Sequence, residues 1–175
     1  NFDKEMIKEA YKLLKTRLKR NEIPLKILKN KKVLDMGCGS GRYSIALKKL
    51  GAKKVIGMDF GEGKKLKYKG VQYVNGSALK LPFEDNSFDF VFCNGVLHHT
   101  TDPIKGIKEM YRVLKPNCWS WLFVCGECKF YEMLDDIRKN LNSKDSKKFR
   151  KLLELWQLPK QKQFFLTDLL FVAIR

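Results

Sequence analysis

The chain has 175 residues and carries 36 Lys and Arg side chains against 19 Asp and Glu, a formal net charge of +17. This length fits one domain with a substantial core, and a hydrophobic content of 44% is typical of a globular protein rather than a disordered one. No apolar run approaches the roughly 18 residues of a membrane span, and the N-terminus lacks the apolar segment of a signal peptide. Because the first residue is Asn1 and not Met, we expect a trimmed or partial chain.

The first expected element is an amphipathic helix, because residues 3–20 place apolar side chains at helical spacing among lysines. Pro24 then precedes a short helical piece at 25–28. Beyond it strand and helix patterns alternate, as they do in a parallel sheet with helices on both faces. The expected strands are 33–36, 54–59, 71–74, 88–93 and 119–125, and the expected helices between them are 41–50 and 102–114.

Three glycines at alternate positions follow the first strand, in the stretch Gly37-Cys38-Gly39-Ser40-Gly41. A strand that turns into a helix through glycines brings backbone N–H groups and a helix N-terminus close to a ligand. The dinucleotide spacing G-x-G-x-x-G would need glycine at Arg42, so this turn argues against a nicotinamide or flavin cofactor. The second strand ends in Asp59, where an acid can accept both hydroxyls of an adenosine ribose.

Five blocks in a fixed order resemble the class I S-adenosylmethionine-dependent methyltransferases, in particular a type 11-like methyltransferase domain. Together with Asp59, the blocks are 33–41, 75–83, 87–91, 95–99 and 110–116. The resemblance implies an α/β fold of the Rossmann-like type, a three-layer sandwich. Its mainly parallel sheet would have the order 3-2-1-4-5 with helices on both faces, and its closing strands would be incomplete in this chain.

The same resemblance implies S-adenosylmethionine as methyl donor and S-adenosylhomocysteine as product. Ligands of open parallel sheets bind at the carboxyl ends of the strands, where the strand order reverses, and here that point lies between the first and fourth strands. The residues expected to bind the cofactor are Asp35, Gly37, Cys38, Gly39, Ser40, Gly41, Asp59, Phe60, Ser77, Ala78, Leu79, Asn94 and Gly95.

Their roles follow from the same resemblance. Asp35 would face the methionine ammonium group, Asp59 would bind the ribose, and Phe60 would lie beside the adenine. Ser77 stands where many relatives have an aspartate for the adenine amino group, and a hydroxyl can accept only an uncharged hydrogen bond there. Ala78 and Leu79 would flank the adenine ring, and Asn94 with Gly95 would border the site of methyl transfer.

His98 and His99 are the candidate catalytic residues, because an imidazole with a pKa near neutrality can deprotonate a hydroxyl or amine nucleophile. The alternative is that both only line the site. Methyl transfer depends largely on proximity and alignment, so an enzyme is expected with or without a base. Cys125 and Cys128 form a C-x-x-C that these histidines could complete as a zinc site, but two cysteines alone do not make one, and we expect no metal.

The chain divides into three expected segments: a helical cap at 1–30, a cofactor-binding core at 31–128, and a helical segment with an apolar tail at 129–175 that looks cut short. We predict a cytoplasmic methyltransferase, because the cysteine pattern suits reduced thiols. Its acceptor would be a small molecule. Two alternatives stay open: an enzyme that modifies tRNA or other RNA, whose wobble-uridine members resemble the same blocks, and a cofactor-binding subunit without activity.

The positive charge is spread along the whole chain and is carried mainly by lysine. A nucleic-acid surface more often has an Arg-bearing cluster interleaved with aromatic side chains. The charge pattern therefore favours a solvated surface over an RNA interface. Neither the acceptor nor the oligomeric state follows from the sequence.

Overall fold

The structure is a computed structural model that describes residues 2–21, 23–61 and 66–123. In chain order its elements are α1 (Phe2–Arg20), η1 (Leu25–Leu28), β1 (Lys32–Met36), α2 (Arg42–Lys49), β2 (Lys54–Asp59), β3 (Val71–Asn75), β4 (Phe88–Asn94), η2 (Leu97–His99), α3 (Pro103–Val113) and β5 (Leu114–Phe123). The segment 129–175, with its expected helices and tail, lies outside the described residues, as do Cys125 and Cys128.

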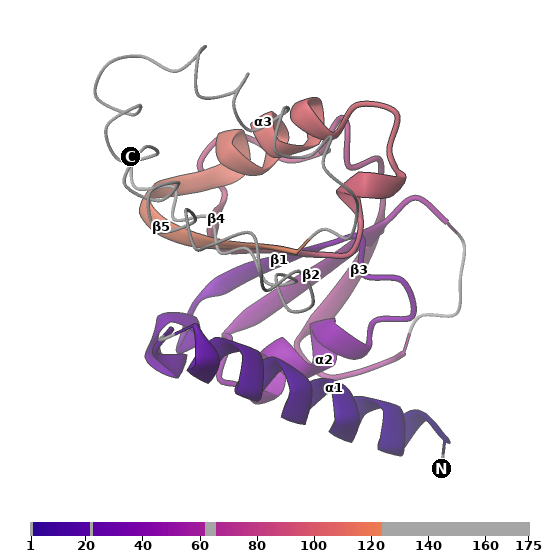
Figure 1. The fold of residues 1–175 in the computed structure, drawn as a ribbon, viewed down its shortest axis with the longest axis vertical. Helices are drawn as coiled ribbons and strands as arrows, with labels where there is room; N and C mark the ends of the chain where they lie inside the picture. Colours follow the sequence, from indigo (N-terminus) through magenta and orange to yellow (C-terminus); the bar gives the residue numbers. More distant parts are fainter. Residues whose placement is uncertain (1, 22, 62–65, 124–175) are drawn as a thin grey trace, which may run out of the picture.

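The five strands form one sheet of order β3-β2-β1-β4-β5, in which every neighbouring pair is parallel. Figure 1 shows α1 and α2 together on one side of this sheet and α3 on the other. The predicted α/β class, strand order and layering are therefore confirmed. In the described part of the chain the sheet is open, with β3 and β5 as its edges, and the expected closing strands fall outside that part.

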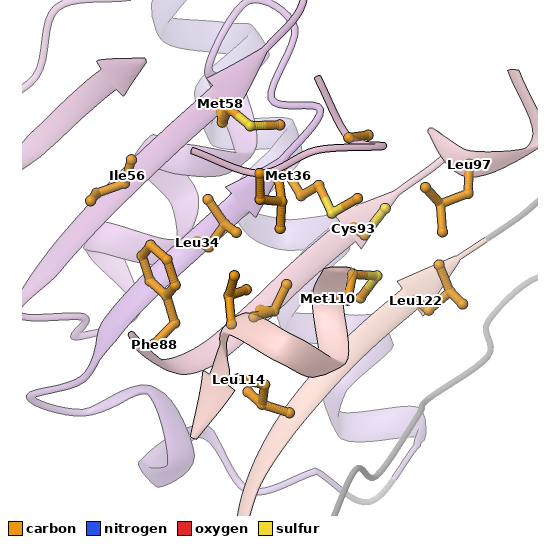
Figure 2. Packing of buried hydrophobic residues seen from close by; sticks show 14 residues of the cluster. Leu34, Met36, Ile56, Met58, Phe88, Cys93, Leu97, Met110, Leu114 and Leu122 are labelled. Carbon is orange, nitrogen blue, oxygen red and sulfur yellow. The ribbon is translucent and has the colours of Figure 1, made fainter. Parts of the chain in front are cut away.

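Alternate side chains of β1 enter two separate cores, as the two-residue period of a strand requires. Val33 packs with α1 and α2, whereas Leu34 and Met36 pack with α3, as Figure 2 shows for the second core. Each fully buried Leu or Phe side chain stabilises the fold by about 1.5–3 kcal/mol. Burial on both faces explains why the central strands are almost continuously apolar.

Helix α1 is amphipathic, as predicted, and packs against α2. Its Leu14 and Leu18 are fully buried in the core that α1 shares with α2 and the sheet. No helix in the described parts of the chain combines the length and the apolar character needed to cross a membrane.

Helix α3 begins as its sequence predicts. Asp102 is the N-cap, and its Oδ1 accepts a 2.9 Å hydrogen bond from the backbone N–H of Lys105, while Pro103 occupies the first turn. These are the residue types that favour a helix start, because the cap satisfies a backbone donor that has no partner within the helix.

The predicted start of the last strand was wrong. We expected a helix that ends at 114 and a strand that begins at Trp119, but β5 begins at Leu114, directly after α3. Phe88 pairs with Leu114 and Phe90 with Trp119, so the strand bulges between these two pairs. Asn117 lies in the bulge at a φ of 57°, a left-handed conformation that asparagine adopts more readily than most residues.

Candidate active site

The turn between β1 and α2 needs glycine for two different reasons. Gly37, Gly39 and Gly41 all have positive φ, at 75°, 51° and 93°. In addition, a Cβ atom at Gly41 would overlap the ring of Tyr73, and one at Gly37 would overlap the side chain of Val96. Among the described residues, a Cβ at Gly39 would meet no atom within 4 Å, so this glycine faces open space in that part of the structure. The turn is therefore closed at both ends and open in its middle.

Backbone hydrogen bonds attach this glycine turn to β2. The N–H groups of Gly37 and Cys38 both donate to the carbonyl oxygen of Met58, at 2.7 and 2.9 Å, and the N–H of Gly41 donates to the carbonyl of Cys38 at 2.9 Å. The turn is thus held at the carboxyl edge of the two central strands, where open parallel sheets bind ligands.

Asp59 lies at the end of β2 next to the same turn. Its Oδ2 accepts a 2.7 Å hydrogen bond from the N–H of Gly39, and its Oδ1 accepts one from the N–H of Gly61 at 3.1 Å. A carboxylate has about four acceptor positions, so Asp59 retains capacity for ligand hydroxyls. The neighbouring Phe60 is 79% exposed, which leaves a flat apolar ring available beside the carboxylate.

Asp35 differs from Asp59 in being buried, with 2% of its surface exposed. Its Oδ2 accepts a 2.6 Å hydrogen bond from the hydroxyl of Ser44, which is itself fully buried in α2. The Asp35 carboxylate therefore lies between β1 and α2. The sequence analysis missed Ser44, although its position one turn into the following helix places it over the end of the strand.

Tyr73 of β3 is a second residue that the sequence analysis missed. Its hydroxyl donates a 2.7 Å hydrogen bond to the carbonyl oxygen of Leu66. Burial raises the pKa of Tyr73 to about 12, with smaller contributions from Cys38 and Asp35, so the phenol stays neutral at any physiological pH. Its signal in the sequence is indirect: Gly41 and Gly57 leave the space that its ring occupies.

The expected adenine-side residues form a tight turn after β3. The hydroxyl oxygen of Ser77 accepts a 3.2 Å hydrogen bond from the N–H of Leu79, and the carbonyl of Ser77 accepts one from the N–H of Lys80 at 3.1 Å. Ala78 is 9% exposed and contributes to the α3 core, while Leu79 is half-buried. One of the two acceptor positions of the Ser77 hydroxyl is thus engaged within its own turn, which leaves its O–H and its second lone pair for a ligand.

Arg112 of α3 fixes the loop that follows this turn. All five of its N–H donors have acceptors at 2.7–3.1 Å, namely the carbonyl oxygens of Leu81 and Phe83 and the carboxylates of Asp85 and Glu109. Glu109 also accepts a 2.6 Å hydrogen bond from the N–H of Leu81. The hydrogen bonds from Arg112 hold the pKa of Glu109 below its usual range, so this carboxylate stays charged.

The end of β4 holds a polar contact that reaches across to the N-terminal helix. Oδ1 of Asn94 accepts hydrogen bonds from Nη1 of Arg17 at 3.1 Å and from Nε1 of Trp121 at 3.3 Å. The N–H of the next residue, Gly95, donates to the carbonyl of Phe123 at 2.8 Å. Arg17 was not predicted as a site residue, but a basic side chain within the apolar stripe of α1 was a usable signal.

His98 and His99 lie in η2, just beyond β4, with their ring centroids 4.0 Å apart. His98 is half-buried and His99 is exposed. Burial, and to a lesser degree the charge of His99, lower the pKa of His98 below 6.5. At neutral pH the His98 imidazole is therefore uncharged and able to accept a proton.

No three His, Cys, Asp or Glu side chains come together as a metal-binding group within the described residues. The cysteines of this part of the chain, Cys38, Cys93 and Cys118, are reduced. The zinc site that the sequence analysis considered would need Cys125 and Cys128, which lie outside the described residues.

An open parallel sheet with this strand order, a glycine turn after β1 and an acid at the end of β2 defines a Rossmann-like nucleotide-binding domain. The model of the methyltransferase domain family matches residues 34–122, and the chain belongs to this family. The predicted resemblance is thus confirmed.

Curated relatives include the demethylmenaquinone methyltransferase of Staphylococcus aureus (strain MRSA252), which is 38% identical over 117 residues, 62% of this chain and 47% of that protein. The chain therefore spans about half the length of the curated relatives it matches. Among solved structures, it resembles a complex between the Haloferax volcanii Trm112 methyltransferase activator and a methyltransferase, with a TM-score of 0.58, 26% identity and coverage of 70% of this chain and 55% of that one.

A second solved structure is an arsenic(III) S-adenosylmethionine methyltransferase from Chlamydomonas reinhardtii. Its TM-score is 0.50 at 26% identity, and the match covers 55% of this chain and 39% of that chain.

Proposed function

We propose that this protein transfers a methyl group from S-adenosylmethionine to a small-molecule acceptor. The observation that carries the proposal is the glycine turn, which Tyr73 and Val96 close at its two ends. Its middle, at Gly39, has no described residue within 4 Å of an added Cβ and lies beside the Asp59 carboxylate. Such a turn leaves room for the backbone to approach a ligand. Membership of the methyltransferase domain family supports the same donor.

The residues present fit S-adenosylmethionine. Asp59 would accept hydrogen bonds from the ribose hydroxyls, the exposed ring of Phe60 would stack beside the adenine, and Asp35 would face the methionine end from below the turn. When bound, the cofactor supplies a methyl group on a positively charged sulfur, a good leaving group. The task of the chain is then to hold the acceptor in line and to exclude water.

We further propose that the acceptor is a flat hydroxylated aromatic ring of the reduced quinone class. The support is the relative from Staphylococcus aureus, whose name states that it methylates demethylmenaquinone. The chain offers a suitable group just beyond β4, the uncharged imidazole of His98, which lies near the largely buried ring of Phe123 at the end of β5. His98 would take the proton of an acceptor hydroxyl and leave its electron pair on the oxygen.

The proposal is tested with calorimetry and with label transfer. S-adenosylhomocysteine should bind and NAD should not, and Asp59→Ala should weaken binding by about 1–3 kcal/mol, because the ribose hydroxyls lose a charged acceptor. Glu84→Ala, an exposed acid on the loop before β4, should leave the affinity unchanged. Labelled methyl from S-adenosylmethionine should enter a reduced naphthoquinone, and label found in RNA instead would contradict the acceptor class.

A second candidate function is that of a cofactor-binding subunit that acts with a partner protein. Its support is the similarity to a Haloferax volcanii methyltransferase that was solved together with the Trm112 activator. Turnover of a small acceptor by the purified chain would contradict this candidate. Binding of S-adenosylhomocysteine without turnover would favour it.

We also propose that the protein acts in the cytoplasm. The support is that Cys93 is fully buried as a reduced thiol, and that burial raises its pKa well above the usual range. Reduced thiols of this kind are typical of proteins kept in a reducing compartment. Fractionation of cells that produce the protein would test the location.

A further inference from the structure

Arg17 is the residue through which the N-terminal helix reaches the carboxyl edge of the sheet. Its guanidinium donates from Nη1 to Oδ1 of Asn94 at 3.1 Å, and its central carbon lies 4.8 Å from the ring centroid of Phe123. Asn94 and Phe123 are the last residues of β4 and β5. The guanidinium charge of Arg17 is thus held at the strand ends, beside the edge at which the methyl acceptor would bind.

The amide group of Asn94 has an orientation that chemistry dictates. Arg17 and the indole N–H of Trp121 can only donate, so the oxygen of the amide must face both. The amide nitrogen must then point away from these two donors. Among the described residues the structure gives this NH2 group no acceptor, so Asn94 offers a hydrogen-bond donor next to a fixed cation.

The same corner of the site also contains the candidate base. A Cβ atom built on Gly95 would lie 3.9 Å from Cδ1 of Phe123 and 4.0 Å from Cε1 of His98. The Phe123 ring, over which Arg17 lies, and the His98 imidazole therefore flank one glycine. A cation, an aromatic face and a neutral imidazole are brought together from α1, β5 and η2.

We propose that Arg17, together with the NH2 group of Asn94, binds an oxygen anion of the methyl acceptor and thereby selects acceptors with an ionisable hydroxyl on a flat ring. This inference rests on the proposed function and specifies the chemistry of its acceptor. A guanidinium is always charged and forms strong charge-assisted hydrogen bonds to anionic oxygen. The acceptor's hydroxyl proton passes to the imidazole nitrogen of His98, and the electron pair that remains on the oxygen is paired with Arg17.

The test compares two dyes that differ in one charge: lawsone, a hydroxynaphthoquinone that is ionised at neutral pH, and its uncharged methyl ether. In the presence of S-adenosylhomocysteine, the wild-type chain should bind lawsone about 10-fold or more tighter than the ether, the effect of one charge-assisted hydrogen bond. Arg17→Gln should abolish this preference, Arg17→Lys should retain part of it, and Lys15→Gln, an exposed cation on the same helix, should leave it unchanged.

The inference is overturned if the wild-type chain shows no preference for the anion, or if the preference survives in Arg17→Gln. It is also overturned if both Arg17 variants lose S-adenosylhomocysteine affinity, because Arg17 would then serve the cofactor. The proposed function is tested separately. If the chain prefers lawsone through Arg17 but methylates no reduced naphthoquinone, the oxyanion site is supported and the proposed acceptor is contradicted. If S-adenosylhomocysteine itself does not bind, the dye preference measured without it still decides the role of Arg17.

Discussion

The hydroxyl of Ser44 donates a 2.6 Å hydrogen bond to Oδ2 of Asp35, and both side chains are buried where β1 and α2 meet. A carboxylate removed from water is costly unless hydrogen bonds replace its hydration. This bond therefore fixes the Asp35 carboxylate and ties the first turn of α2 to the strand before the glycine turn. It makes the geometry of the turn depend on a residue outside the glycine motif.

Ser44→Ala should destabilise the protein by about 1–3 kcal/mol, because it removes a hydrogen bond from a buried carboxylate. Urea unfolding measures this loss. Ser87→Ala is the matched control: its hydroxyl also makes a 2.6 Å hydrogen bond, to the carbonyl of Glu84, but at an exposed position. If the free energy of unfolding falls by the same small amount in both variants, the contact with Asp35 does not stabilise the fold.

Gly41→Ala should cost more stability than Gly39→Ala. Both glycines have positive φ, which costs an alanine roughly 1–2 kcal/mol. Only at Gly41 would the new methyl group also overlap the Tyr73 ring, so that β3 must shift or α2 must start later. Urea unfolding of the two variants isolates the overlap, and equal losses would show that Tyr73 moves aside without cost.

The strands around the turn could be predicted closely because their signals are local. Short, mostly apolar runs placed β1, β2, β3 and β4 within one residue at each end. The start of β5 could not be predicted in the same way. Its first residues pair with Phe88 across a bulge, and the ammonium group of Lys115 contacts Asp89 of β4 at 2.8 Å, so tertiary contacts decide where this strand begins.

The same difference between local and tertiary signals applies to the residues of the candidate site. The glycines and Asp59 could be recognised because their spacing in the chain carries the pattern. Ser44, Tyr73 and Arg17 had only indirect signals, since each acts through a partner on another element: Arg17 and Asn94 are 77 residues apart. A single Ser, Tyr or Arg side chain in a sequence is compatible with many surfaces and cores, and only the fold brings it to the site.

Arg112→Lys should destabilise the protein by about 1.5–3 kcal/mol and loosen the loop at 79–87. A lysine keeps the charge but has no planar fork, so it cannot satisfy Glu109 and the carbonyls of Leu81 and Phe83 together. Hydrogen exchange of the loop amides, together with urea unfolding, measures both effects. Lys108→Ala, an exposed change on the same helix, should alter neither, and unchanged exchange in Arg112→Lys would contradict the anchoring role.

If His98 is the base, the pH profile of kcat/KM should fall on the acid side with a midpoint below 6.5, because burial and His99 lower its pKa. Activity falls at low pH because the neutral imidazole is the active form, and protonation removes this form as the pH drops through the midpoint. His99→Gln removes the repelling neighbour and should move the midpoint upward, toward 6.5. His98→Gln should reduce the rate by about 10²–10⁴-fold. If kcat/KM of this variant still falls at low pH with the same midpoint, the titrating group is not His98.

Because the net charge is +17, the salt dependence of RNA binding can distinguish a small-molecule acceptor from an RNA acceptor. Exposed lysines follow one another along α1, including Lys8, Lys12, Lys15 and Lys19. Each phosphate that such a surface neutralises releases a counterion, so affinity falls by orders of magnitude between about 50 and 200 mM salt. With charge that is dispersed and carried by lysine, we expect weak tRNA binding that does not distinguish one tRNA from another and disappears near physiological salt.

Filter binding over a series of salt concentrations, with a structured tRNA and a single-stranded RNA measured side by side, tests this expectation. A submicromolar complex that prefers the tRNA at physiological salt would move the acceptor from a small molecule to RNA.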